Sequence, residues 1–106
     1  MYHTVMWTFN VPAGMSRADI LQRIDATAHT YLGIPGLIRK YYALAEDGKT
    51  MSGIYLWESK AQADAFYTPA WVELVTARWE GKAVRTSWDT PMVVDGRENR
   101  LESGGA

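Results

Sequence analysis

The 106-residue chain contains no cysteine, which excludes disulfides, thiolate metal sites and a cysteine nucleophile. Its formal net charge is −1 and like charges are not clustered, so we expect no nucleic-acid partner, which would need a basic patch. No apolar run approaches the roughly 20 residues that span a bilayer, so no membrane partner is expected. The first residues lack the basic start and apolar run of a signal peptide, which favours the cytoplasm.

Motifs for common catalytic machinery are also missing. The two histidines, His3 and His29, lie on different predicted elements, and His29 points away from the apolar face of its helix, so we expect no metal. There is no G-x-S-x-G elbow for a nucleophilic serine. No glycine-rich dinucleotide fingerprint supports a nicotinamide or flavin cofactor. The sequence therefore predicts a site without a resident cofactor.

Aromatic residues, in contrast, are abundant. The chain has five Trp, six Tyr and two Phe. Such side chains bring a large buried area, and Tyr and Trp add a polar tip that needs a partner. Most of them are expected to fill a core, and the others to line a pocket for a flat ligand or an interface with another subunit.

The hydrophobic pattern predicts four strands and two helical regions. Strands are expected at 3–10, 37–45, 50–58 and 83–89, and helices at 17–32 and from Ser59 to Gly81 with a break at "YTPAW". The order βαββαβ is typical of the ferredoxin-like α+β fold, a four-stranded antiparallel sheet with two helical regions on one face. We expect one domain over 1–94, with "PMVV" as a short edge strand, and a flexible tail over 95–106.

The stretch "SGIYLWES" at residues 52–59 predicts a strand that is apolar on both faces. Tyr55 and Trp57 point to one side, and Ile54 and Leu56 to the other. Helices can cover only one face, and a second apolar face would expose more surface than a monomer usually tolerates. We therefore expect a homodimer whose sheets pack face to face, with a cavity between sheet and helices. The pattern does not decide which pair faces the helices.

Three segments carry a family resemblance: "GLIRK" at 36–40, "SGIYLW" at 52–57 and "SWDTP" at 87–91. Together they resemble the YdhR-like monooxygenase family of the dimeric α+β barrel superfamily. The resemblance implies oxygenation of a small aromatic or polycyclic phenol without metal or flavin. Haem-degrading members of the superfamily typically use an axial histidine on the second helix. Residues 60–80 contain none, so haem fits poorly, with only a tyrosine ligand left open.

Oxygenation of a phenol needs an aromatic surface, a cation or donor that lowers the phenol pKa, and exclusion of water. As catalytic candidates we name Arg39, Tyr55 and Trp57, and as substrate-binding candidates Trp7, Asn10, Tyr42, Tyr67, Trp71 and Arg85. Other interpretations stay open at this point: Arg39 and Arg85 sit at edges of the sheet or pair with Glu58 and Asp89 in the subunit interface, and Asn10 is a turn residue.

Two other functions fit the same fold. One is a cyclase, isomerase or decarboxylase, which needs a base and an oxyanion donor but no O2. The other is a dimer that binds a hydrophobic small molecule without catalysis. Fold alone does not choose between these functions.

Overall fold

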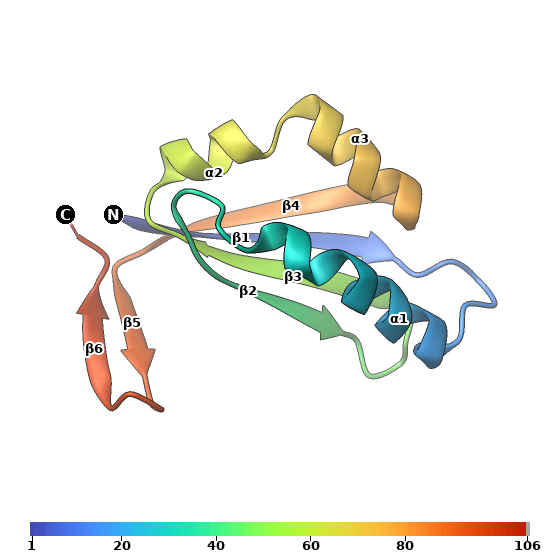
Figure 1. Ribbon diagram of the computed structural model, residues 1–106, viewed down its shortest axis with the longest axis horizontal. Helices are drawn as coiled ribbons and strands as arrows, with labels where there is room; N and C mark the ends of the chain where they lie inside the picture. Colours follow the sequence, from blue (N-terminus) through green and yellow to red (C-terminus); the bar gives the residue numbers. More distant parts are fainter. Residues whose placement is uncertain (106) are drawn as a thin grey trace.

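The computed structural model describes residues 1–105. The chain forms, in order, β1 (Tyr2–Asn10), α1 (Arg17–Ala28), a 3₁₀ turn (His29–Tyr31), β2 (Leu37–Leu44), β3 (Thr50–Trp57), α2 (Lys60–Phe66), α3 (Pro69–Arg78), β4 (Glu80–Thr90), β5 (Met92–Asp95) and β6 (Arg100–Ser103). Strands β1 to β4 make one sheet in the order β2-β3-β1-β4, and each neighbouring pair is antiparallel. The helices cover one face of this sheet (Figure 1). The predicted ferredoxin-like α+β fold is confirmed.

The helices begin where their capping residues predict. Ser16 accepts a hydrogen bond from the backbone N–H of Asp19, whose side chain accepts from the N–H of Ser16, which is a capping box. The predicted break between α2 and α3 falls at Thr68, which caps α3 ahead of Pro69. Proline suits the first helical turn because its missing N–H would have no partner there. None of the helices in the described chain is both long and apolar enough to cross a membrane.

The end of the second helical region differs from the prediction. The helix ends at Arg78 and Trp79 is already extended, so Gly81 lies inside β4 and does not close the helix. Gly81 has a positive φ of 73°, and a side chain there would meet the amide of Asn10, whose Cα pairs with that of Glu80. A left-handed residue next to a register shift is typical of a bulge, which lengthens β4 toward the helix.

The core lies between the sheet and the helices. Along β1 and β3 buried and half-buried residues alternate, as expected for strands that have a different neighbour on each face. The buried residues Val5, Trp7, Phe9, Tyr55 and Trp57 pack in one cluster with residues of α2 and α3. Tyr55 and Trp57 therefore face the helices, which answers the question that the sequence pattern left open.

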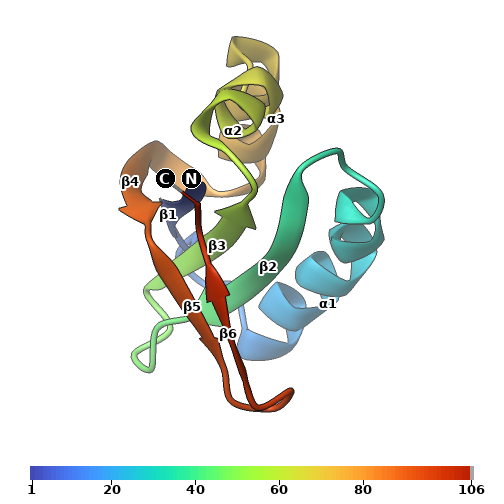
Figure 2. The same cartoon turned by 90° about the vertical axis from the view of Figure 1, so that its left-hand side faces the viewer.

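The other face of the sheet has no helix over it. Ile54 and Leu56 are half-buried there, while Val84 and Trp88 on β4 are exposed. Strands β5 and β6 form a separate two-stranded hairpin, which runs past this side of the sheet at the end where the two termini meet (Figure 2). A short strand at "PMVV" was predicted, but the pairing of Met92–Asp95 with Arg100–Ser103 was not.

The flexibility of the tail 95–106 stays a prediction. Polar composition suggested it, yet this segment contains the turn and second strand of the hairpin, and Gly104 joins β1 through the N–H of Tyr2. Ala106, the last residue of that segment, lies outside the described residues.

Neighbouring residues of α1 offer a test of how this helix packs. Ile20 is 2% exposed and Leu21 is 49% exposed. We expect Ile20→Ala to lower the free energy of unfolding by about 2–5 kcal/mol, because it leaves a cavity in the core. Leu21→Ala is the matched control and should cost less than about 1 kcal/mol. Urea denaturation measures both, and equal losses would contradict this placement of α1.

Candidate functional site

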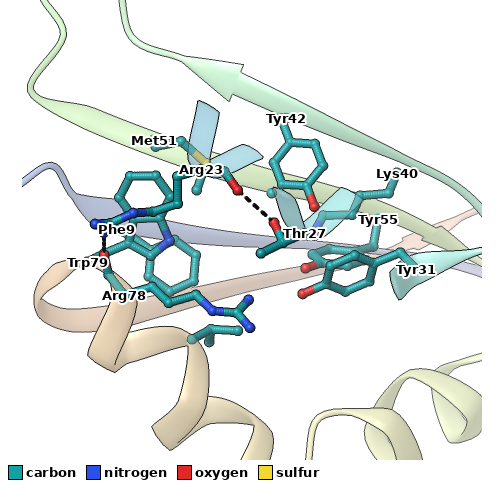
Figure 3. Close-up of a pocket in the computed structure, with 12 residues that line it drawn as sticks. Phe9, Arg23, Thr27, Tyr31, Lys40, Tyr42, Met51, Tyr55, Arg78 and Trp79 are labelled. Carbon is teal, nitrogen blue, oxygen red and sulfur yellow. Dashed lines mark hydrogen bonds between the residues drawn. The ribbon is translucent and has the colours of Figure 1, made fainter. Parts of the chain in front are cut away.

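A small cavity lies between α1, α3 and the helix-facing side of the sheet. Its volume is about 20 Å³, room for roughly one water molecule. Tyr31, Tyr42 and Tyr55 line one side of it, and Arg23, Lys40 and Arg78 bring three cationic side chains to it (Figure 3). The cavity thus combines an aromatic wall with positive charge.

Lys40 reaches this cavity because of its register in β2. Its Cα pairs with that of Tyr55 on β3, so its side chain points to the helix-covered side, whereas the adjacent Arg39 pairs with Leu56. The Lys40 Nζ atom lies 3.3 Å from the ring centroid of Tyr31, 4.0 Å from that of Tyr42 and 4.6 Å from that of Tyr55. Three aromatic rings therefore form a cage around one amino group.

The charges at the cavity are not balanced by acids. No Asp or Glu is among the lining residues of the described chain, and Arg23, Lys40 and Arg78 make no ion pair with a described carboxylate. Arg23 donates a hydrogen bond to the carbonyl of Arg78, and its guanidinium lies 5.4 Å from the ring centroid of Trp79. Buried charges are usually paired, so this uncompensated set favours an anionic ligand.

Burial alters the acidity of these groups. Burial, with a smaller contribution from Arg78, lowers the pKa of Lys40 to about 7. Burial is also the main cause that raises the pKa values of Tyr42 and Tyr55, so both phenols stay protonated at neutral pH. The hydroxyl oxygen of Tyr42 is buried without a hydrogen-bond partner in the described chain. Near pH 7, Lys40 is therefore the side chain of this group that exchanges a proton.

A larger cleft adjoins the cavity on the side of β2. Its volume is about 430 Å³, within the range of small-molecule sites, and Tyr31, Lys40 and Tyr42 line both spaces. Leu32, which is 80% exposed, lies at the cleft with Leu37. Lys40 and Arg39 are its charged lining residues, and both are cations. An aromatic ligand in the cleft would meet apolar walls and the side chain of Lys40.

Four of the predicted substrate-binding residues do meet, but in a packed cluster beside the cavity. Trp7, Tyr67 and Trp71 are in mutual ring contact with centroids 4.8–5.4 Å apart, and the guanidinium of Arg85 lies 5.1 Å from the ring centroid of Tyr67. Trp57, a predicted catalytic residue, joins them: its Nε1 donates to the Tyr67 hydroxyl at 3.0 Å. The buried Nε1 of Trp7 has no hydrogen-bond partner among residues 1–105.

Of the nine predicted site residues, Tyr42 and Tyr55 line the small cavity. Arg39 does not join Tyr55 and Trp57, because it pairs with Leu56 on the helix-free face. Its guanidinium lies 3.5 Å from the carboxylate of Asp95 in the hairpin. Arg39 also lines the cleft. Asn10 is exposed at the end of β1, next to Gly81. The functional roles of all nine residues stay predictions.

Arg39 lies on β2 and Arg85 on β4, which are the two edge strands of the sheet, as the alternative interpretation expected. Within the described chain Arg39 pairs with Asp95, and Arg85 pairs with Asp64 of α2 at 2.7 Å. Pairing with Glu58 and Asp89 across a subunit interface stays a prediction. Asp64 projects from a helix onto the same side as Arg85, and Asp95 comes from a hairpin that was not predicted. The alternation of side chains along the strands does not predict either of these two ion pairs.

Sequence reasoning missed Arg23, Tyr31, Lys40 and Arg78. The signal for Lys40 was present: Arg39 and Lys40 are adjacent in a strand, so one of them had to face the helices. Arg23 and Arg78 gave no such signal, because arginine on a helix usually faces solvent.

Metal and haem can be tested against the residues present. The described chain has no group of three or more His, Cys, Asp or Glu side chains that could hold a metal ion. Helices α2 and α3 carry no histidine, and the hydroxyl of Tyr67 already accepts a hydrogen bond from Trp57. A cavity of about 20 Å³ does not admit a macrocycle. The small cavity and the second helical region therefore do not fit haem.

Comparison with solved structures places this geometry in a fold group. ActVA-Orf6 of Streptomyces coelicolor, a monooxygenase solved with nanaomycin D, has a TM-score of 0.62 and 16% identity, over 81% of this chain and 84% of its own. SnoaB of Streptomyces nogalater, a cofactor-independent oxygenase, has a TM-score of 0.63 and 18% identity, over 88% and 96%. MhuD, solved with manganese protoporphyrin IX, has a TM-score of 0.66 and 19% identity, over 89% and 99%.

These likenesses show the fold. The chain is a ferredoxin-like α+β protein, and its structural neighbours include monooxygenases of this fold. No family model matches the sequence, and no curated protein matches it. Identities of 16–19% do not carry a substrate or an activity from these neighbours to this chain.

The buried amino group leads to a prediction about stability. The unfolded chain holds Lys40 with its ordinary pKa of 10.5, whereas the folded value is about 7. Between these two pKa values the unfolded state binds more protons than the folded state, so the free energy of unfolding rises with pH. Below about pH 7 Lys40 is charged in both states, and the fold bears the full cost of burying that charge. We expect Lys40→Met to stabilise the fold near pH 6 by on the order of a few kcal/mol, and this gain to shrink toward pH 10.5.

Urea denaturation of the wild type and Lys40→Met at several pH values measures this. Lys49→Met is the control, because Lys49 is exposed in the turn before β3 and should show no such trend. A difference between Lys40→Met and wild type that stays constant with pH would contradict the desolvation of Lys40.

Proposed function

We propose that this protein is a monooxygenase that oxidises a small aromatic or polycyclic phenol without metal or flavin. The observation that carries the proposal is the pair of adjoining spaces lined by tyrosines and by cations without a lining carboxylate. Aromatic walls suit a flat ring, and the cations suit the phenolate that must form before an electron passes to O2. Monooxygenases among the neighbours of the same fold support this choice.

The electron balance limits the product. With no external reductant, the substrate must supply all four electrons that reduce O2. A phenol that gains one oxygen atom and becomes a quinone does so, and the second oxygen atom leaves as water. The protein's share is to hold the ring, stabilise the phenolate and keep water from the intermediate. We therefore expect one O2 consumed for each quinone formed.

The finer family assignment and the oligomeric state belong to this proposal. We assign the chain to the YdhR-like group on the three sequence segments described above. We also propose a homodimer in which the helix-free faces of two sheets meet, because Ile54, Leu56, Val84 and Trp88 lie on that face and are not fully buried.

A second candidate is a reaction without O2, such as an isomerisation or decarboxylation. The specific observation in its favour is Lys40, whose pKa of about 7 suits a general base. Arg78 at the same cavity would stabilise an enolate. A reaction of this kind would use the same site and the same cationic side chains.

Oxygen uptake tests the function. Purified protein is incubated with phenols of one to three rings, and O2 consumption and quinone absorbance are followed together. Arg78→Gln should lower kcat/KM by about ten- to a hundredfold, because the guanidinium of Arg78 lies at the small cavity behind Lys40 and adds to the positive charge that holds the phenolate. Arg17→Gln, on the exposed first turn of α1, is the matched control. Turnover that continues without O2 would favour the second candidate, and no uptake across the panel would contradict the oxygenase.

Sedimentation tests the dimer. At micromolar concentration we expect twice the chain mass. Ile54→Glu should reduce it to a single chain, because a charge would be buried between the sheets. Ala61→Glu adds the same charge on the exposed surface of α2 and should leave the dimer intact. A well-folded wild-type particle of single-chain mass would contradict the proposal.

A further inference from the structure

Lys40 stands between the two spaces of the site. The small cavity and the outer cleft share Tyr31, Lys40 and Tyr42, so these side chains form the wall that separates them. The cleft has the volume for a ligand of one or two rings, whereas the cavity holds about one water molecule. A ligand in the cleft would therefore contact Lys40 without any need to enter the cavity.

We propose that Lys40 is the proton acceptor for an aromatic hydroxyl bound in the outer cleft, and that its ammonium form then holds the phenolate. This inference rests on the phenolic substrate proposed above, and it does not depend on O2. The proton moves from the hydroxyl oxygen to the Lys40 nitrogen, the O–H bond breaks, and an N–H bond forms. No other reactant is needed.

The groups around Lys40 single it out for this role. The charged or titratable side chains that border the two spaces are Arg23 of α1, Tyr31 of the 3₁₀ turn, Arg39 and Tyr42 of β2, Tyr55 of β3 and Arg78 of α3. Arginine does not give up its proton in proteins, and a tyrosine hydroxyl is no stronger a base than the phenol it would serve. Among the lining groups of the described chain, the Lys40 amine is therefore the one that can accept the proton.

The cage also explains how the ammonium is tolerated once it forms. The three rings around the Lys40 nitrogen present their faces to it and attract a cation. The phenolate supplies the negative charge that the cavity lacks. A phenol pKa of about 10 against about 7 for Lys40 opposes the transfer by about three pK units. An adjacent opposite charge shifts a pKa by about one to three units, so the ammonium, with Arg78 behind it, can offset this cost.

Absorption spectroscopy with 2-naphthol tests the inference, because the neutral and ionised forms of this probe have different spectra. The full-length protein is titrated at a pH of about 8.5, above the folded pKa of Lys40 and below that of a free phenol. We expect wild type to bind the probe as naphtholate, with an affinity that changes little between about pH 8.5 and the pKa of the probe, because no net proton is exchanged with the buffer in that range. Trp fluorescence quenching reports binding independently of ionisation.

Two variants separate proton transfer from simple charge attraction. Lys40→Met should bind the probe in its neutral form, and more weakly. Lys40→Arg keeps the charge but cannot accept the proton, so the proton must go to the buffer and affinity should rise about tenfold per pH unit up to the pKa of the probe. Lys49→Met should behave as wild type. Circular dichroism confirms that each variant is folded.

Wild type that binds neutral 2-naphthol, or Lys40→Arg with the flat pH profile of wild type, would overturn the role of Lys40 and leave phenol binding in place. Failure to bind 2-naphthol at all would overturn the role and the proposed substrate class together. Naphtholate bound by wild type, without oxygen uptake on any phenol, would support the role of Lys40 and defeat the oxygenase function alone.

Discussion

The register between β2 and β3 is the constraint on which the rest of the structure depends. Because side chains alternate along a strand, turning Tyr55 and Trp57 toward the helices leaves Ile54 and Leu56 on the other face. The same pairing turns Lys40 inward and Arg39 outward. A slip of one residue would exchange all of these sides at once. The aromatic core, the caged amino group and the apolar helix-free face are therefore consequences of one pairing.

The cationic side chains at the site destabilise the fold, and packing of the core does not require them. Three cations border one cavity without a lining carboxylate, and burial pulls the pKa of Lys40 down to about 7. An apolar side chain in place of Lys40 would pack in the same space without this penalty. Perturbed groups that lack a structural partner are typical of functional sites, since the missing charge is supplied by a ligand. Arg85, on the opposite edge strand of the sheet, shows the contrast, because Asp64 neutralises it.

Most of the fold could be predicted from local patterns, whereas the site could not. The capping residues Ser16 and Thr68 and the order of the elements are local signals, and the structure confirms them. The pairing of β5 with β6 was missed because the turn and β6 are mostly polar and exposed, so no buried face marks the second strand. The site depends on contacts between α1, β2 and α3, which are distant in sequence. Arg39 and Lys40 point to opposite faces of the sheet, and the strand pattern alone does not show which of the two faces the helices.

The two candidate functions, oxygenation and isomerisation, use the same residues. Oxygenation of a phenol and isomerisation through an enolate both require that the substrate lose a proton and that the resulting anion be held, and they differ in where the electrons of that anion go next. Lys40, the tyrosine cage and Arg78 serve the shared first step. Trp7, Tyr67 and Trp71 pack against one another and are not among the residues that line the small cavity in the described chain. The chemistry that distinguishes the two reactions must therefore depend on which ligand the cleft of about 430 Å³ admits and on whether O2 reaches it there.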